Sequence, residues 1–168
     1  LKKHAVKAIF FMTGEKAAKY PELLRKITND GHVIGNHTFS HSNFFPLYPV
    51  KKMVGEINRA SEIIEDATGK KVTFFRPPFG ITNPNIGRAV RKTGKKVVGW
   101  SLRSFDTMMV DSQIMKDKIL NNIKDGDIVL FHDTRVQTAQ ILDNLIEVCI
   151  ERGFEFFDAG DLPGVGND

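Results

Sequence analysis

Short apolar runs alternate with longer amphipathic stretches along the whole chain. The first run, Val6–Met12, predicts a buried strand that ends at Gly14. Similar runs predict strands at 32–35, 72–75, 96–101, 128–131 and 154–157. Apolar positions at helical spacing predict helices at 20–27, 50–68, 84–92, 112–123 and 138–151. This alternation of strands and helices favours an α/β fold with a parallel sheet, either doubly wound or closed into a barrel.

Polar side chains follow four of these predicted strands. They are Asn36–His37, Arg76–Pro78, Ser101–Asp106 and His132–Asp133. In parallel α/β folds the chemistry is found at the carboxyl ends of the strands. Their repeated placement therefore predicts a catalytic face.

Composition limits the classes of protein that fit. The 168 residues predict one compact domain over 1–168. The 24 basic residues exceed the 20 acidic ones by only four and are scattered, so no nucleic-acid partner is expected. Cys149 is the one cysteine, which excludes a disulfide within the chain, and its apolar neighbours predict a packing role. The apolar runs are too short to span a membrane.

Three of the five histidines lie at predicted strand ends. His37 and His41 are four residues apart, and on one turn of helix the two imidazoles would face the same way and could bind one ion. The alternative is a polar turn whose histidines bond the backbone. The placement of His37, His41 and His132 at strand ends favours the metal-binding interpretation.

Two further segments carry candidate chemistry. Arg76–Gly80 places two prolines and a glycine after a strand, a rigid backbone that could aim a free N–H at a ligand. Its arginine suits either a carboxylate ligand or a structural ion pair. His132 follows a strand and could act as a general acid or base, with Asp106 as the carboxylate that fixes its tautomer. The alternative for His132 is a surface histidine that caps the next loop.

Four segments in this order resemble motifs two to five of the NodB-homology polysaccharide deacetylases, carbohydrate esterase family 4. They are His37–His41, Arg76–Gly80, Ser104–Asp106 and Leu130–Asp133. Val6–Gly14 resembles the stretch between motifs one and two, so the resemblance covers essentially the whole chain. It implies the irregular (β/α) barrel of that family, here without its first strand.

The resemblance also implies a role for each motif. His37 and His41 would bind a divalent metal, usually zinc, with cobalt or nickel as alternatives, and its bound water would attack the acetyl carbonyl. His132 would protonate the departing amine while Asp106 sets its tautomer. Arg76 would orient the catalytic base.

Three residues would contact the substrate if the resemblance holds. The backbone N–H of Phe79 would hold the oxyanion together with the metal, Leu130 would line the pocket for the acetyl methyl group, and Pro78 would lie beside the sugar. The implied partner is an acetylated glycan, and a location in the cell envelope or outside the cell is expected from the family.

The family's first motif is missing. Its Asp-Asp pair supplies the base and the third metal ligand, and no such pair occurs in the 168 residues. The chain begins with Leu1 rather than methionine, and we expect it to be incomplete at its N-terminus. Two histidine ligands alone predict weak metal binding and feeble hydrolysis. An exposed sheet edge would remain, which a second copy or a swapped strand would cover.

Motif four also departs from the family. Arg103 stands where aspartate is common and Thr107 where tryptophan is common. Arg103 would bind an anionic sugar or pair with an acidic residue outside this chain. The function predicted is metal-dependent removal of N-acetyl groups from a peptidoglycan or chitin-like glycan. The alternatives are a carbohydrate-binding domain with impaired catalysis and an O-acetyl xylan esterase.

Overall fold

The computed structural model describes residues 1–109 and 111–158. Contacts between Cα atoms divide the chain into two compact units. One unit, here the 7–98 unit, contains residues 7–98. The other, the 99–157 unit, contains residues 99–157 together with residues 1–6. Each unit has its own sheet and its own hydrophobic core.

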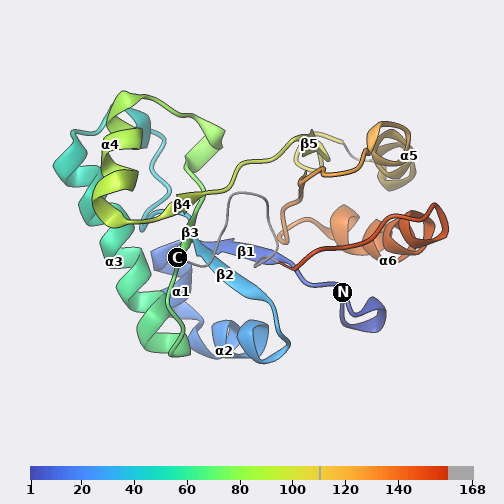
Figure 1. Cartoon of the computed structure of the whole chain (residues 1–168), viewed down its shortest axis with the longest axis horizontal. Coiled ribbons are helices and arrows are strands. Elements are labelled where there is room, and N and C mark those ends of the chain that lie inside the picture. The colour runs from blue at the N-terminus through green and yellow to red at the C-terminus, as the bar shows by residue number, and fades with distance from the viewer. Residues whose placement is uncertain (110, 159–168) are drawn as a thin grey trace. The chain divides into compact units, whose positions relative to one another are not determined.

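The 7–98 unit is built on a parallel sheet in the order β1-β2-β3-β4 (Figure 1). The strands are β1 (Ile9–Met12), β2 (Val33–Asn36), β3 (Phe74–Phe75) and β4 (Lys96–Val97). Met12 pairs with Asn36, and Asn36 pairs with Phe75, so these strands end at the same level. This register brings the residues that follow them, His37 and Arg76, to one edge of the sheet.

Four helices pack around this sheet: α1 (Gly14–Lys19), α2 (Pro21–Asn29), α3 (Val50–Thr68) and α4 (Pro84–Thr93). The long helix α3 contacts α1, α2, α4 and β2 (Figure 1). Its bounds match the predicted 50–68, because Gly69 adopts a left-handed conformation, φ 66°, that ends the helix.

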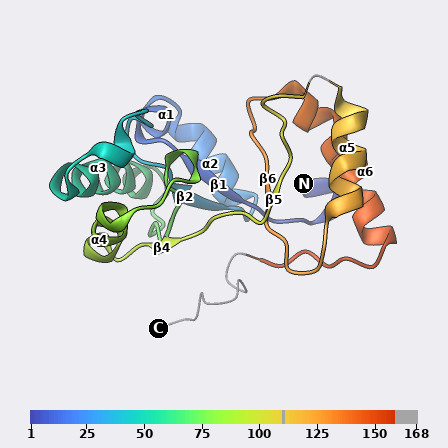
Figure 2. The same cartoon turned by 90° about the horizontal axis from the view of Figure 1, so that it is seen from above.

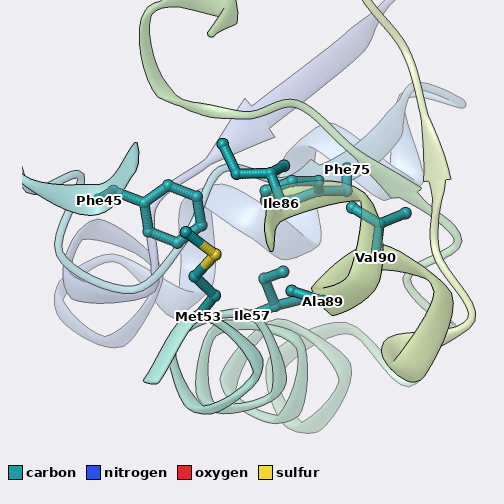
Figure 3. Close-up of a cluster of buried hydrophobic side chains, with 7 residues drawn as sticks. All are labelled: Phe45, Met53, Ile57, Phe75, Ile86, Ala89 and Val90. Carbon is teal, nitrogen blue, oxygen red and sulfur yellow. The ribbon is translucent and has the colours of Figure 1, made fainter. Parts of the chain in front are cut away.

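The larger apolar cluster of this unit lies between α3, α4 and the sheet (Figure 3). Its buried members are Phe45, Met53, Ile57, Phe75, Ile86, Ala89 and Val90. Phe45 comes from the short 3-10 helix η2 (Phe45–Leu47), which follows the histidine segment. Burying its ring fixes the chain just after His41, at a gain of about 2 kcal/mol. The core of the 7–98 unit therefore also positions the candidate site.

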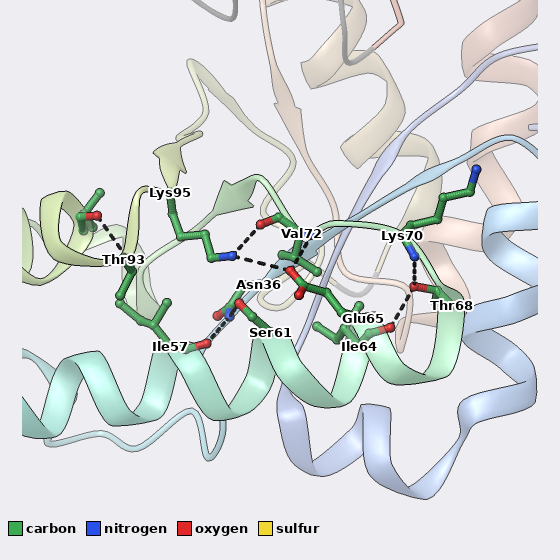
Figure 4. Close-up of polar contacts among 11 residues, drawn as sticks. Asn36, Ile57, Ser61, Ile64, Glu65, Thr68, Lys70, Val72, Thr93 and Lys95 are labelled. Carbon is green, nitrogen blue, oxygen red and sulfur yellow. Dashed lines mark hydrogen bonds and ion pairs between the residues drawn. The ribbon is translucent and has the colours of Figure 1, made fainter. Parts of the chain in front are cut away.

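Polar contacts hold the far end of α3 to the sheet (Figure 4). Glu65 on α3 accepts a hydrogen bond from the backbone N–H of Val72 at 2.8 Å and pairs with Lys95 at 3.8 Å. Burial lowers the pKa of Lys95. These contacts fix the chain that leads into β3.

The 99–157 unit is smaller and consists of paired strands and paired helices. The strands β5 (Leu102–Arg103) and β6 (Val129–Leu130) are parallel, and α5 (Ser112–Asn122) lies beside α6 (Val136–Glu151) (Figure 2). Cys149 is 2% exposed in their shared apolar cluster, which confirms its packing role. The N-terminal 3-10 helix η1 (Lys2–His4) is held to α6 by an ion pair from Lys3 to Asp143 and by a contact of His4 Nε2 with the same carboxylate at 2.6 Å.

Strands alternating with helices and parallel pairing confirm the predicted α/β class, and two predicted strands were wrong in detail. Of the run 96–101 only Lys96–Val97 form a strand, β4, which pairs with β3; the next strand, β5, begins at Leu102 and pairs with β6. Residues 154–157 form no strand, and Phe157 is 68% exposed, so its side chain lies against no second layer. The described strands form a four-stranded and a two-stranded sheet, and a closed barrel stays a prediction.

The segment between β1 and β2 contains two helices where the sequence predicts one. The sequence predicts one helix over 20–27, whereas the chain forms α1 and then α2, separated at Tyr20. Thr13 caps α1 by accepting a hydrogen bond from the backbone N–H of Lys16. None of the helices in the described part of the chain has the length and apolar content that a membrane span requires.

Candidate active site

His37 and His41 lie in the loop that follows β2, and this loop is not helical. The prediction that one helical turn would align the two imidazoles was therefore wrong. The rings still meet, with centroids 4.7 Å apart and planes at 61°. Left-handed conformations at Thr38, φ 66°, and at His41, φ 50°, turn the loop back on itself. Such conformations are costly for residues other than glycine and often mark functional sites.

The buried side chain of Asn36 joins this loop to α3, and Figure 4 shows its contacts with Ile57 and Ser61. Its Oδ1 accepts a hydrogen bond from the Thr38 N–H at 2.8 Å. Its Nδ2 donates to the carbonyl oxygen of Ile57 at 2.7 Å and to Oγ of Ser61 at 2.9 Å, both on α3. The Thr38 hydroxyl then accepts from the N–H of His41 at 3.0 Å. A polar network on α3 therefore positions the histidine pair.

Each imidazole of the pair has a described partner in the segment 76–79. Nδ1 of His37 lies 2.6 Å from the carbonyl oxygen of Arg76, which places Nε2 on the opposite side of the ring. A backbone carbonyl on one ring nitrogen is a common second partner of metal-bound histidine. His41 packs its ring edge to face with Phe79, centroids 5.0 Å apart. Imidazole nitrogens are donors of the kind that a zinc-like ion takes.

A third protein ligand for this pair is not found among the described residues. The group of three potential metal ligands in that part of the chain is His4, Asp143 and Glu147, in the other unit. There the ammonium of Lys3 lies 2.9 Å from both carboxylates and already compensates their charge.

Arg76 follows β3 and is 9% exposed. Its guanidinium lies over the ring of Phe11 at 4.1 Å, and its Nε donates to the carbonyl oxygen of Val98 at 3.0 Å. Burial lowers the pKa of Arg76 to about 10. A buried cation held in this way is suited to bind a carboxylate.

The segment after Arg76 presents Phe79 to solvent. Pro78 is buried in a short 3-10 turn, and Phe79 takes a left-handed conformation, φ 60°, with 51% of its surface exposed. Pro77 and Pro78 restrict the backbone before Phe79. The position of the Phe79 N–H is therefore determined by the backbone and does not depend on packing of the exposed Phe79 side chain.

Asp106 and His132 lie together in the 99–157 unit. One Asp106 oxygen is 2.8 Å from Nδ1 of His132, and the other accepts the His132 backbone N–H at 2.6 Å and the Thr138 hydroxyl at 2.8 Å. Burial opposes ionisation of Asp106, but these hydrogen bonds outweigh it and lower the pKa of the carboxyl. A carboxylate on Nδ1 fixes the tautomer that carries its proton there.

His132 remains accessible while its partner is buried. The His132 side chain is 41% exposed and that of Asp106 is 1% exposed. Phe105, next to Asp106, has φ 60°, and Leu130, two residues before His132, is 8% exposed. The backbone turn at Phe105 and the hydrogen bonds from His132 and Thr138 thus fix the Asp106 carboxylate. The accessible imidazole of His132 can contact a solute.

The predicted site residues fall into two groups. Those of the 7–98 unit are His37, His41, Arg76, Pro78 and Phe79, and those of the 99–157 unit are Asp106, Leu130 and His132. Sequence reasoning missed Thr138, which donates to Asp106. Its signal was a hydroxyl on the buried stripe of α6, three residues before Ile141.

Comparison with known proteins adds the family. The polysaccharide deacetylase family model matches residues 1–98. A peptidoglycan-N-acetylglucosamine deacetylase of Bacillus cereus is 35% identical over 134 residues, which are 80% of this chain and 48% of that protein. The peptidoglycan-N-acetylmuramic acid deacetylase PdaC of Bacillus subtilis is 29% identical over 165 residues, 98% of this chain and 34% of that protein.

A solved structure has a similar fold. A CE4 family pseudoenzyme from Bacillus anthracis matches with a TM-score of 0.91 and 25% identity, over 98% of this chain and 58% of that one. The fold and the two residue groups define an α/β protein with candidate metal-binding and acid–base side chains at strand ends. The chain belongs to the polysaccharide deacetylase family. It spans about half the length of the Bacillus cereus relative and about a third of PdaC.

Proposed function

We propose that this protein is a metal-dependent hydrolase that removes N-acetyl groups from a glycan of the peptidoglycan or chitin type. The observation that carries the proposal is the Asp106–His132 pair, a buried carboxylate on Nδ1 of an accessible imidazole. The relatives named as peptidoglycan deacetylases support the substrate class.

His37 and His41 would hold the metal ion through ring nitrogens. When bound, a divalent ion such as zinc, cobalt or nickel polarises a carbonyl and lowers the pKa of a bound water. The Arg76 carbonyl on Nδ1 of His37 fixes the ring and leaves Nε2 as its donor atom. With two protein ligands the affinity would be weaker than that of sites with three.

The remaining residues would handle protons and charge. In its imidazolium form, with the Nδ1–H donated to Asp106, His132 would transfer the Nε2 proton to the amine nitrogen as it departs and would be left neutral. The N–H of Phe79 would donate to the oxygen that becomes negative, and Pro78 and Leu130 would contact the sugar and the acetyl methyl group. Arg76 would orient a carboxylate base, for which this chain has no Asp-Asp pair.

The absent Asp-Asp pair favours a second candidate function. A domain that keeps the metal ligands and the acid but lacks the base would bind acetylated glycans and turn them over feebly. A matching structure that is named a CE4 family pseudoenzyme supports this candidate. O-acetyl xylan esterase activity would use the same residues on an ester.

The experiment measures acetate release from N-acetylglucosamine oligomers, peptidoglycan and acetylated xylan, with zinc added and with a chelator. The variants are His37→Ala and His132→Ala. His4→Ala is the matched control, because His4 also pairs with an aspartate, Asp143, but that carboxylate is exposed. Zinc-dependent release that falls in the two variants and not in the control supports the proposal. Undiminished release by both variants contradicts the assigned roles, and binding without release selects the binding domain.

A further inference from the structure

The ring of Phe105 holds two cations in the 99–157 unit. Nζ of Lys118, on α5, lies 4.0 Å from the ring centroid, and Cζ of Arg103, on β5, lies 5.4 Å from it. An aromatic face attracts cations through its quadrupole, by about 1 kcal/mol at exposed sites. The ring of Phe105 is therefore a shared partner of two cations, one from α5 and one from β5.

Neither cation has a carboxylate partner within residues 1–109 and 111–158. Lys3, by contrast, pairs with two carboxylates. The nearby acids of α5 are engaged elsewhere: Asp111 caps the helix, accepting from the N–H groups of residues 113 and 114, and Asp117 accepts from the side chain of Gln113. Arg103 and Lys118 are both exposed, so their charges remain available to an anion.

The backbone places this cationic pair next to the candidate acid. Phe105 has a left-handed conformation between two buried residues, Ser104 and Asp106, which fixes the direction of its side chain. Arg103 pairs in the parallel register with Leu130, two residues before His132. A ligand held by Arg103 and Lys118 would therefore lie close to the Asp106–His132 pair.

We infer that Arg103, Lys118 and Phe105 form a subsite for the carboxylate of an acidic, N-acetylated sugar. The inference rests on the proposed function and names its substrate class. The guanidinium supplies paired N–H donors that match a carboxylate, and the ammonium adds a second charge. Two sugars serve as probes for this group: a muramic acid residue, which carries the carboxylate on its lactyl ether, and a uronic acid residue, which carries it at C6.

Binding of defined oligosaccharides, measured by calorimetry on the whole protein at low ionic strength, tests this subsite. The ligands are a neutral N-acetylglucosamine oligomer, an oligomer of equal length that contains N-acetylmuramic acid, and one that contains a uronic acid. The variants are Arg103→Gln and Lys118→Gln. The matched control is Lys116→Gln on the same helix, whose Nζ donates to Asn144.

We expect Arg103→Gln and Lys118→Gln each to weaken binding of an acidic oligomer about tenfold, with the neutral oligomer and the control unchanged. The acidic oligomer that shows this loss identifies the carboxylate. Equal losses for neutral and acidic ligands, or no loss beyond that of Lys116→Gln, overturn the inference. Because binding is measured without turnover, failure of the proposed deacetylation would appear separately, as absent acetate release with the binding difference intact.

Discussion

The two units position their histidines in different ways. In the 99–157 unit a buried carboxylate, Asp106, accepts three hydrogen bonds and holds His132 from the ring and from the backbone. In the 7–98 unit His37 bonds a backbone carbonyl, and a buried amide, Asn36, shapes the loop. The described contacts of the first group centre on a charged side chain, and those of the second centre on the backbone.

This difference determines what each group can do alone. The Asp106–His132 pair has the partners that proton transfer needs within its own unit. The His37–His41 pair offers an ion two nitrogens, and the described residues supply no third ligand within reach. The two groups can therefore be tested separately, the acid by turnover and the histidine pair by metal affinity.

The largest expected effect is that of His132→Ala on turnover. Loss of the acid should lower kcat roughly 10²–10⁴-fold, because the amine must then leave without a positioned proton donor. The side chain is 41% exposed, so the free energy of unfolding should change little. Acetate release under saturating substrate, with thermal unfolding as the folding control, checks this. A kcat within twofold of the parent would show that His132 is not the acid.

His41→Ala should weaken zinc binding by about 100-fold, because one imidazole alone is a poor site. Titration with a zinc indicator measures the affinity. His4→Ala is the control, since His4 belongs to the other group of metal-capable side chains, with Asp143 and Glu147. If zinc affinity fell in His4→Ala and persisted in His41→Ala, the ion would bind the 99–157 unit. The assignment of metal binding to the 7–98 unit would then be wrong.

Asp106→Asn should destabilise the protein by about 2 kcal/mol at neutral pH, because a buried charged acceptor of three hydrogen bonds is lost. The folded state lowers the pKa of Asp106, so this stabilisation is complete above the ordinary aspartate range. It is lost as pH falls through the lowered pKa. Urea unfolding at pH 7 and at pH 3 should therefore show a difference from the parent that shrinks in acid.

The control for that series is Asp143→Asn. Asp143 also pairs with a histidine, His4, at 2.6 Å, but its side chain is 56% exposed. Exposed pairs are screened by water, so no measurable change in unfolding is expected. Equal destabilisation by both substitutions would mean that burial of Asp106 is not the source of its effect.

The smallest effect on stability is expected from a change in the Asn36 network that supports the histidine loop. Ser61→Ala removes one acceptor of the Asn36 amide and should cost about 1 kcal/mol, because Nδ2 keeps its bond to Ile57. Urea unfolding measures this cost, and zinc titration shows whether the loop moves. A loss of zinc affinity comparable to that of His41→Ala would show that the network on α3, rather than the histidines alone, defines the metal site.

Much of the fold could be read from local patterns. The helix 50–68 was predicted with its bounds, since apolar spacing and Gly69 act within the chain itself. The prediction of a strand at 154–157 was wrong, because aromatic residues favour a strand only where a neighbouring strand forms hydrogen bonds with it. The helical turn predicted at His37–His41 was also wrong. Thr38 and His41 adopt left-handed conformations, and the amide of Asn36 supports this turn by accepting from the Thr38 N–H.

The sequence by itself determined which residue types follow which strands, and hence the candidates His37, His41, Arg76, Asp106 and His132. It also determined that no Asp-Asp pair is present. Only the tertiary structure decided that Asp106 binds His132 and Thr138, that Arg76 holds His37 through its carbonyl, and that Phe105 gathers two cations. The reason is physical: hydrophobic period and turn residues act over a few positions, whereas burial and hydrogen bonding of a polar group depend on partners distant in sequence.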